Sequence, residues 1–147
     1  MSKQTPTLTG QDIGQAERAT RALLDAVLAE TETTFHQSVV LNLTAANPPS
    51  PAGLDGVVER MTHGLKIGRP TALDAIDELV AKGLVRRAGD PVSLALTPAG
   101  KTRFRSIRHG IEQIAERLYG DLPPEDLATT HRILAIVTER ANAELAA

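Results

Sequence analysis

The chain has 147 residues and a formal net charge of −2, with 16 lysines and arginines against 18 aspartates and glutamates. Cysteine is absent, which excludes disulfides and thiol chemistry, and aromatic residues make up only 2%, so a core must consist of Leu, Ile, Val and Ala. No run approaches the roughly 18 apolar residues of a membrane span, and the residues after Met1 lack the apolar segment of a signal peptide. We therefore expect a single cytoplasmic domain.

Charge is distributed unevenly along the chain. Residues 60–108 contain ten basic and four acidic residues, a net charge of +6, whereas the rest contains six basic and fourteen acidic residues, a net charge of −8. Such a concentration of positive charge is typical of a surface that binds nucleic acid. The alternative is an ordinary solvated surface.

Apolar residues recur at helical spacing through the first half of the chain. Helices are expected over residues 9–30, 34–46, 54–61 and 70–82. Thr9 and Thr34 stand where N-caps belong, and Gln37 completes the capping-box pattern of the second helix. Residues 62–68 are expected to be irregular, and residues 62–66 are interpreted as a small insertion that lengthens the turn before the helix that begins at Pro70.

A small hairpin is predicted after the fourth helix. Gly83 stands where a helix-ending glycine belongs, and two β-like runs follow at residues 84–87 and 92–96, joined by a turn at residues 88–91. Thr97 and Pro98 then have the pattern of an N-cap followed by a first-turn proline. Helix, hairpin and helix in this order predict a winged helix-turn-helix, so the fold class is mainly α with a small β-hairpin wing.

Two long helices are predicted at the C-terminal end, over residues 98–119 and from residue 123 onward. The first has apolar residues at the spacing of a coiled-coil seam, and the second is apolar on more than one side, which favours burial against a second copy of the chain. The predicted dimer-interface residues are Ile111, Ile114, Leu118, Leu127, Leu134 and Val137.

Three strings carry a family resemblance. They are DELVAKGLV at residues 77–85, LTPAG at residues 96–100 and LPPEDL at residues 122–127. In this order they resemble the MarR family of bacterial transcription regulators, with a match from about residue 11 to residue 145. The resemblance implies one MarR-like domain over residues 1–147: a winged helix-turn-helix core at about 35–97, and dimerisation helices at 9–34 and 98–147 that join two copies.

The resemblance also implies that the fourth helix enters the major groove of DNA. Arg69 would donate to guanine, Thr71 would contact phosphate or a thymine methyl, and Lys66, Arg86 and Arg87 would contact phosphates. The predicted DNA-binding residues are Lys66, Arg69, Thr71, Ala72, Asp74, Arg86 and Arg87.

Two features depart from the family pattern. The wing tip, Ala88-Gly89-Asp90-Pro91, carries no arginine for the minor groove, and Asp74 stands where a basic residue is common. A carboxylate facing phosphate weakens binding, although it can accept a hydrogen bond from cytosine N4. The following acids, Asp77 and Glu78, are expected to be solvated or paired with Arg86 or Arg87.

The resemblance implies a small aromatic or phenolic effector as a further partner. Its pocket is predicted among Arg18, Phe35, His36, Val39 and His109. The alternative is that these residues are ordinary core and surface residues.

No cofactor and no metal are expected, because the four histidines form no HxxxH or HExxH pair. A zinc site of His36, His109 and Glu112 is a weaker alternative. No catalytic constellation is present, so an enzyme is not expected.

The sequence thus predicts a homodimeric, sequence-specific, DNA-binding transcription regulator, a repressor that a small molecule releases. The alternative is a winged-helix dimer that binds protein instead of DNA. The acids of the fourth helix and the short wing favour that alternative.

Overall fold

The computed structural model describes residues 7–46 and 52–147. The chain divides into two compact units, residues 1–111 and residues 112–147, and the boundary falls within one long helix. In the part of the chain that the structure describes, no helix is both long and apolar enough to cross a membrane.

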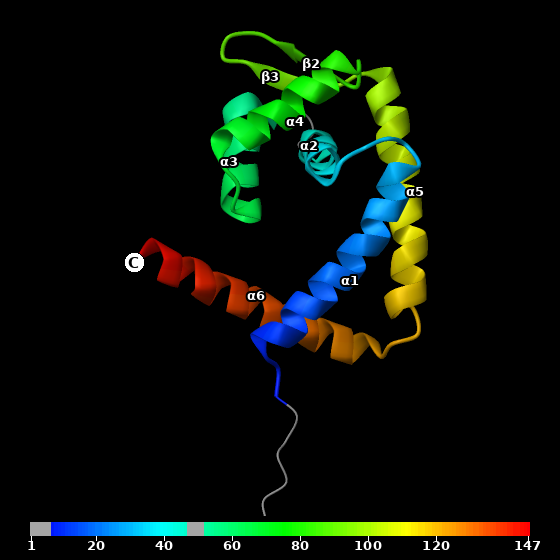
Figure 1. The fold of residues 1–147 in the computed structure, drawn as a ribbon, viewed down its shortest axis with the longest axis vertical. Helices are drawn as coiled ribbons and strands as arrows, with labels where there is room; N and C mark the ends of the chain where they lie inside the picture. The colour runs from blue at the N-terminus through cyan, green and yellow to red at the C-terminus, as the bar shows by residue number, and fades with distance from the viewer. Residues whose placement is uncertain (1–6, 47–51) are drawn as a thin grey trace, which may run out of the picture. The chain divides into compact units, whose positions relative to one another are not determined.

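The larger unit contains most of the elements (Figure 1). They are α1 (Gly10–Ala29), α2 (Phe35–Ala45), β1 (Ala52–Gly53), α3 (Leu54–Leu65), α4 (Arg69–Ala81), β2 (Val85–Ala88), β3 (Ser93–Leu96) and the first turns of α5 (Pro98–Tyr119). The smaller unit holds the end of α5 and α6 (Pro124–Ala146). The prediction of a mainly α chain with a small β wing is confirmed.

Hydrogen-bonding side chains begin three of these helices where the sequence predicts. Thr9 forms a capping box with Asp12 at the start of α1, and Thr34 forms one with Gln37 at the start of α2. The hydroxyl of Thr97 accepts a hydrogen bond from the backbone N–H of Gly100, at 3.0 Å, which caps α5. Each cap satisfies backbone donors that the first turn of a helix leaves without a partner.

The turn between α3 and α4 is shorter than predicted. Helix α3 continues to Leu65, four residues beyond the expected end, and only three residues separate it from α4. Leu65 follows Val58 and Met61 on the apolar face of α3 and packs against the core, as Ile67 does. Lys66 ends the helix in the left-handed conformation, with φ 57°. The predicted insertion is therefore wrong, because core packing extends the helix through Gly64.

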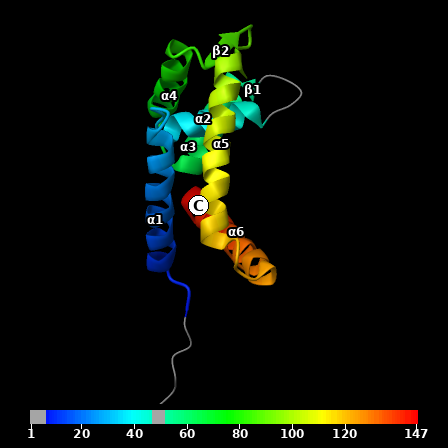
Figure 2. The same ribbon diagram turned by 90° about the vertical axis from the view of Figure 1, so that its right-hand side faces the viewer.

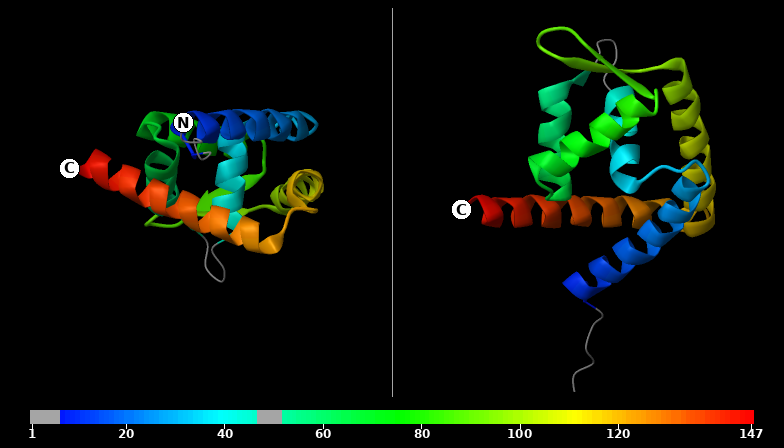
Figure 3. Two further views of the ribbon diagram at one scale, coloured as in Figure 1. Left: turned by 90° about the horizontal axis from the view of Figure 1, so that it is seen from below. Right: turned by 45° about the horizontal axis from the view of Figure 1, so that its top comes forward.

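The wing belongs to a three-stranded sheet. Strands β2 and β3 pair antiparallel, with Val85 opposite Leu96 and Ala88 opposite Ser93. The two-residue strand β1 adds to the other edge of β3, which gives the order β1-β3-β2. Strand β1 has no signal in the sequence, because two residues carry no periodicity. The hairpin projects beyond the helices of this unit (Figure 3, right).

The core of the larger unit is aliphatic, as expected from the composition. Helix α4 contributes a buried stripe of Ala72, Ala75, Ile76 and Leu79. Helix α2, which crosses from the end of α1 toward α5 (Figure 2), packs against α4, and Leu94 of the sheet is fully buried. The remaining buried members of this cluster are Leu28, Val40, Leu41, Val57, Val58, Met61, Leu84, Val85 and Ile107.

Helix α5 is joined to the wing at a close backbone contact. Thr97 donates its hydroxyl to the carbonyl of Gly83 at 2.6 Å and its N–H to the carbonyl of Leu84 at 3.1 Å. A Cβ atom at the buried Gly100 would collide with the carbonyl oxygen of Leu84. Only glycine allows the helix to begin at this distance from the sheet.

We expect Gly100→Ala to lower the free energy of unfolding by about 3 kcal/mol, because backbone must move to admit the methyl group. Gly64→Ala is the matched control: nothing lies within 4 Å of its added Cβ in α3, so it should raise stability by about 0.5 kcal/mol. Urea unfolding monitored by circular dichroism measures both. Equal stability of the two variants would contradict the close contact between Gly100 and the carbonyl of Leu84.

Candidate functional site

The exposed face of α4 is set by the face that it buries. With Ala72, Ala75, Ile76 and Leu79 in the core, Thr71 and Asp74 face solvent, together with Arg69 in the first turn. Ala72 is 0% exposed, so the prediction that it contacts DNA is wrong. The prediction assigned Ala72 to the wrong side of α4. Residue 72 begins the buried stripe at positions i, i+3, i+4 and i+7 and does not belong to the outer face.

Two predicted cations lie around the beginning of α4. The side chain of Arg69 is 59% exposed and lies 3.4 Å from the carboxylate of Asp55, at the start of α3. Lys66 is exposed in the turn before α4, and its ammonium group donates to the carbonyl of His63. The contact of Arg69 with Asp55 is at the surface, where an ion pair is worth less than about 1 kcal/mol. It leaves Arg69 able to change partner.

The two wing arginines point to opposite faces of β2. Adjacent strand residues alternate in direction, and Arg87 pairs with the buried Leu94 whereas Arg86 pairs with Ala95. Arg87 accordingly reaches back to α4 and forms an ion pair with Asp77, which confirms one of the pairings expected for that acid. Arg86 is exposed on the other face.

Not all the basic residues of 60–108 lie free on the surface. The ammonium group of Lys82 donates to the carbonyl of Glu32 at 2.7 Å, and the guanidinium of Arg103 donates to the carbonyl of Thr31 at 2.7 Å. Both cations thus hold the loop between α1 and α2. The net charge of +6 overstates the positive charge available to a partner.

Carboxylates are interleaved with the cations of this face. Asp55, Asp74 and Asp77 are all exposed beside α4 or on it. At the wing, Gly89 adopts φ 88° in the turn, and the exposed acid Asp90 follows it. The surface around α4 therefore carries both signs of charge, with Lys66, Arg69 and Arg87 as its cations, while Arg86 lies on the other face of β2.

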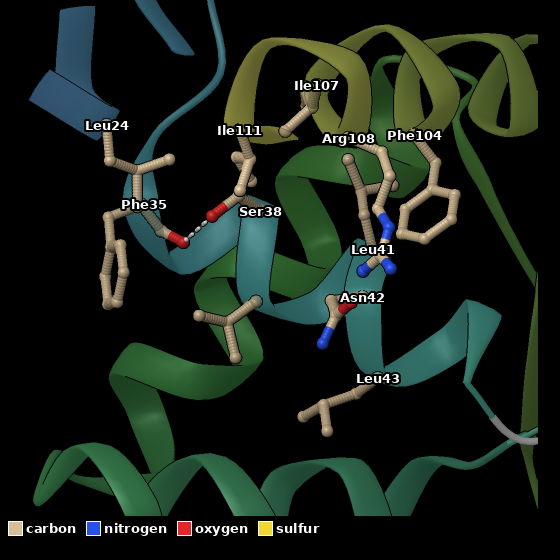
Figure 4. Close-up of a pocket in the computed structure, with 11 residues that line it drawn as sticks. Leu24, Phe35, Ser38, Leu41, Asn42, Leu43, Phe104, Ile107, Arg108 and Ile111 are labelled. Carbon is tan, nitrogen blue, oxygen red and sulfur yellow. Dashed lines mark hydrogen bonds between the residues drawn. The ribbon is translucent and has the colours of Figure 1, made fainter. Parts of the chain in front are cut away.

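A pocket of about 270 Å³ lies within the larger unit (Figure 4). Its walls come from α1, α2 and α5. They are mainly apolar, with Ser38, Asn42 and Arg108 as the polar members. The apolar lining residues are Leu24, Phe35, Val39, Leu41, Leu43, Phe104, Ile107 and Ile111.

Two of the five predicted pocket residues line this space, namely Phe35 and Val39. Arg18, His36 and His109 do not. On α2, Phe35, Ser38, Val39 and Asn42 line the pocket at helical spacing and Leu41 and Leu43 add to it, whereas His36 does not. On α5, the helical spacing from Phe104 selects Arg108 rather than its neighbour His109.

A second basic residue borders the pocket without lining it. The guanidinium carbon of Arg21 lies 3.2 Å from the ring centroid of Phe35, and the same guanidinium contacts Glu17 and Asp25 on α1. Stacking on the ring and two carboxylates hold it in place. Arg21 thus orients the aromatic ring that forms part of the pocket wall.

Among the described residues, no three His, Asp or Glu side chains group in a way that would hold a metal ion.

The predicted dimer residues differ in exposure. Leu134 and Val137 on α6 are 39% and 40% exposed, and Ile111 is 40% exposed. Leu118 and Leu127 are half-buried, and Ile114 is buried within the chain. None of the residues of α6 is buried.

Solved structures share this arrangement of elements. A MarR-family transcriptional regulator from Rhodococcus sp. RHA1 aligns with a TM-score of 0.70 and 18% identity, over 90% of this chain and 96% of that one. MepR of S. aureus, solved as a DNA complex, aligns with a TM-score of 0.77 and 15% identity, over 90% and 96%. NadR in complex with 4-hydroxyphenylacetate aligns with a TM-score of 0.71 and 20% identity, over 94% and 98%.

The chain has the MarR fold. The similarity extends over nearly the full length of both chains in each comparison, although identity is low. No protein-family model and no curated protein matches the sequence. The MarR fold therefore rests on the order and packing of the elements, as the three sequence strings predict.

Proposed function

We propose that this chain is a homodimeric, sequence-specific, DNA-binding transcription regulator, and that it represses until a small molecule binds. The observation that carries the proposal is the exposed first turn of α4. It presents Arg69 and Thr71 outward, while the buried stripe of the helix packs in the core. Lys66 precedes this turn in the sequence, and Arg86 and Arg87 follow in the wing. MepR, of the same fold, has been solved with DNA.

The proposed recognition contacts follow from exposure. Arg69 and Thr71 reach base edges or phosphates, and Asp74 accepts from cytosine N4. Lys66, Arg86 and Arg87 contact phosphates, with Arg87 exchanging its exposed ion pair with Asp77 for a phosphate. Such contacts make affinity fall as salt rises, because bound phosphates release counterions.

We expect wild-type protein to bind a random DNA duplex at low salt, with an affinity that falls steeply as salt increases. Arg69→Ala with Arg86→Ala should weaken binding to a selected operator about 100-fold and lower the salt slope by about 1. Fluorescence anisotropy measures both. Arg132→Ala with Arg140→Ala, two exposed arginines of α6, removes the same charge and serves as control. Equal losses in the two double variants would place the DNA face elsewhere.

One observation favours a second function, a protein-interaction module. The outer face of α4 carries two acids, Asp74 and Asp77, and the wing tip adds Asp90 but no arginine. A surface of mixed charge suits a protein partner better than a uniformly anionic duplex. Absence of duplex binding by the wild-type protein at low salt would favour this alternative.

The proposed dimer would be formed by the apolar residues of the two last helices. Leu134 and Val137 are one helical turn apart on α6, and both are exposed. Because no residue of α6 is buried, the apolar side chains of this helix are left in contact with water, which is unfavourable. A two-fold partner would cover them and would place two α4 helices on successive major grooves.

We expect Leu134→Glu with Val137→Glu to convert a dimer, twice the 15.6 kDa of the chain, into monomer. Burying two carboxylates in an apolar interface costs more than such an interface gains. Sedimentation equilibrium measures the mass. Ala135→Glu, at an exposed position turned about 100° from Leu134 around the helix, should leave the dimer intact. A double variant that remains dimeric would exclude this face of α6 from the interface.

The proposed effector site is the pocket lined by α1, α2 and α5. Its size and mainly apolar walls suit a small aromatic molecule, and Arg108, Ser38 and Asn42 supply groups for a polar or acidic end. NadR has been solved with 4-hydroxyphenylacetate, which has this combination of ring and carboxylate. That compound is a suitable probe.

We expect 4-hydroxyphenylacetate to raise the melting temperature of the wild-type protein and to weaken DNA binding about tenfold. Val39→Trp should abolish both effects, because the indole fills the pocket that Val39 lines. Ala19→Trp, at an exposed position of α1, is the control and should respond as wild type does. Undiminished effects in Val39→Trp would show that the compound acts at another site.

A further inference from the structure

Helix α4 is tied to α2 through the amide of a single buried side chain. Gln37 is 3% exposed. Its Nε2 donates to a carboxylate oxygen of Glu78 at 3.1 Å, and its Oε1 accepts from the ammonium group of Lys82 at 3.2 Å. Glu78 and Lys82 lie one turn apart at the end of α4, so one amide reaches two consecutive turns of that helix.

The same amide is anchored on its own helix. Its Oε1 also accepts from the backbone N–H of Thr34 at 3.2 Å, as half of the capping box that begins α2. The side chain therefore has little freedom to rotate. Both of its polar ends are used, and a buried amide with unsatisfied groups would be costly.

This polar link differs in kind from the rest of the contact between the two helices. The buried face of α4 is otherwise formed by Ala72, Ala75, Ile76 and Leu79. The aliphatic stripe decides which face of α4 is buried, and the hydrogen bonds add a directional requirement on the alignment of donor and acceptor. The amide of Gln37 thus distinguishes one rotation of α4 from its neighbours.

Helix α2 also borders the pocket. Phe35, Ser38 and Asn42 line it, whereas Gln37, Val40 and Thr44 are buried at the intervening helical positions. Lys82 and Arg103 additionally bind the loop before α2, at Glu32 and Thr31. The end of α4 and the first turns of α5 are therefore both hydrogen-bonded to the loop that leads into α2.

We propose that Gln37 is a positioning residue for recognition: it sets the rotation at which α4 presents its outer face. The inference rests on the proposed DNA-binding function. Phosphate contacts tolerate a small rotation of the helix, because they read no sequence, whereas base-edge contacts do not. Loss of the link therefore reduces discrimination between sequences more than it reduces affinity for DNA in general.

Comparison of Glu78→Ala with Glu78→Gln separates the effect of the hydrogen bond to Gln37 from the effect of the carboxylate charge. Both remove the same carboxylate from an exposed residue, but the glutamine Oε1 still accepts from Gln37 Nε2. We expect the ratio of affinities for a selected operator and a random duplex to fall about tenfold in Glu78→Ala relative to Glu78→Gln. Affinity for the random duplex should be the same in the two variants. Equal ratios would overturn the inference.

Hydrogen exchange in the free protein supplies a readout that needs no DNA. Backbone amides in the last two turns of α4 should exchange faster in Glu78→Ala than in Glu78→Gln, because the helix is held less firmly. Wild-type protein that binds no duplex would overturn the proposed function. Exchange would then still decide whether Gln37 holds α4, and equal rates in the two variants would show that it does not.

A second pair tests the amide itself. Gln37→Leu removes both links to α4 and half of the capping box, whereas Thr34→Ala removes the cap bond to the backbone N–H of Gln37 and leaves the amide in place. The operator-to-random ratio should fall in Gln37→Leu and stay near the wild-type value in Thr34→Ala. A similar fall in both would assign the effect to helix capping rather than to the position of α4.

Discussion

The structure depends on the packing of one face of α4 against the core. Ala72, Ala75, Ile76 and Leu79 are buried in succession, and the two alanines allow other side chains to approach the helix axis closely. Burial of this stripe decides which residues remain outside. Arg69, Thr71 and Asp74 face solvent for the same reason that Ala72 does not. The residues that α4 exposes are therefore determined by the residues that it buries.

Basic residues serve two purposes in this chain, and only their surroundings distinguish them. Lys82 and Arg103 donate to backbone carbonyls of the loop before α2, so they hold the helices of the larger unit together. Arg69 and Arg87 form exposed ion pairs with Asp55 and Asp77, which compete weakly with an anionic partner. A count of charges along the sequence does not separate these groups, which is why it overstates the positive face.

Helix α2 connects the features that concern function. One set of its residues lines the pocket, another is buried, and the amide of Gln37 reaches α4. Hydrogen bonds of Gln37 with Glu78 and Lys82 therefore link a helix that lines the pocket to the end of α4.

The sequence by itself determined the elements whose signals are local. Thr9, Thr34 and Thr97 cap their helices as expected, and the hairpin strands lie within one residue of their predicted places, because caps and turns depend on neighbouring residues. Tertiary structure alone decided what depends on distant partners. Packing of Leu65 extends α3, pairing with β3 creates β1, and the rotation of α4 and α5 places Ala72 in the core and Arg108 rather than His109 at the pocket. A shift of one residue turns a helical side chain by about 100°, and only contacts between elements fix that angle.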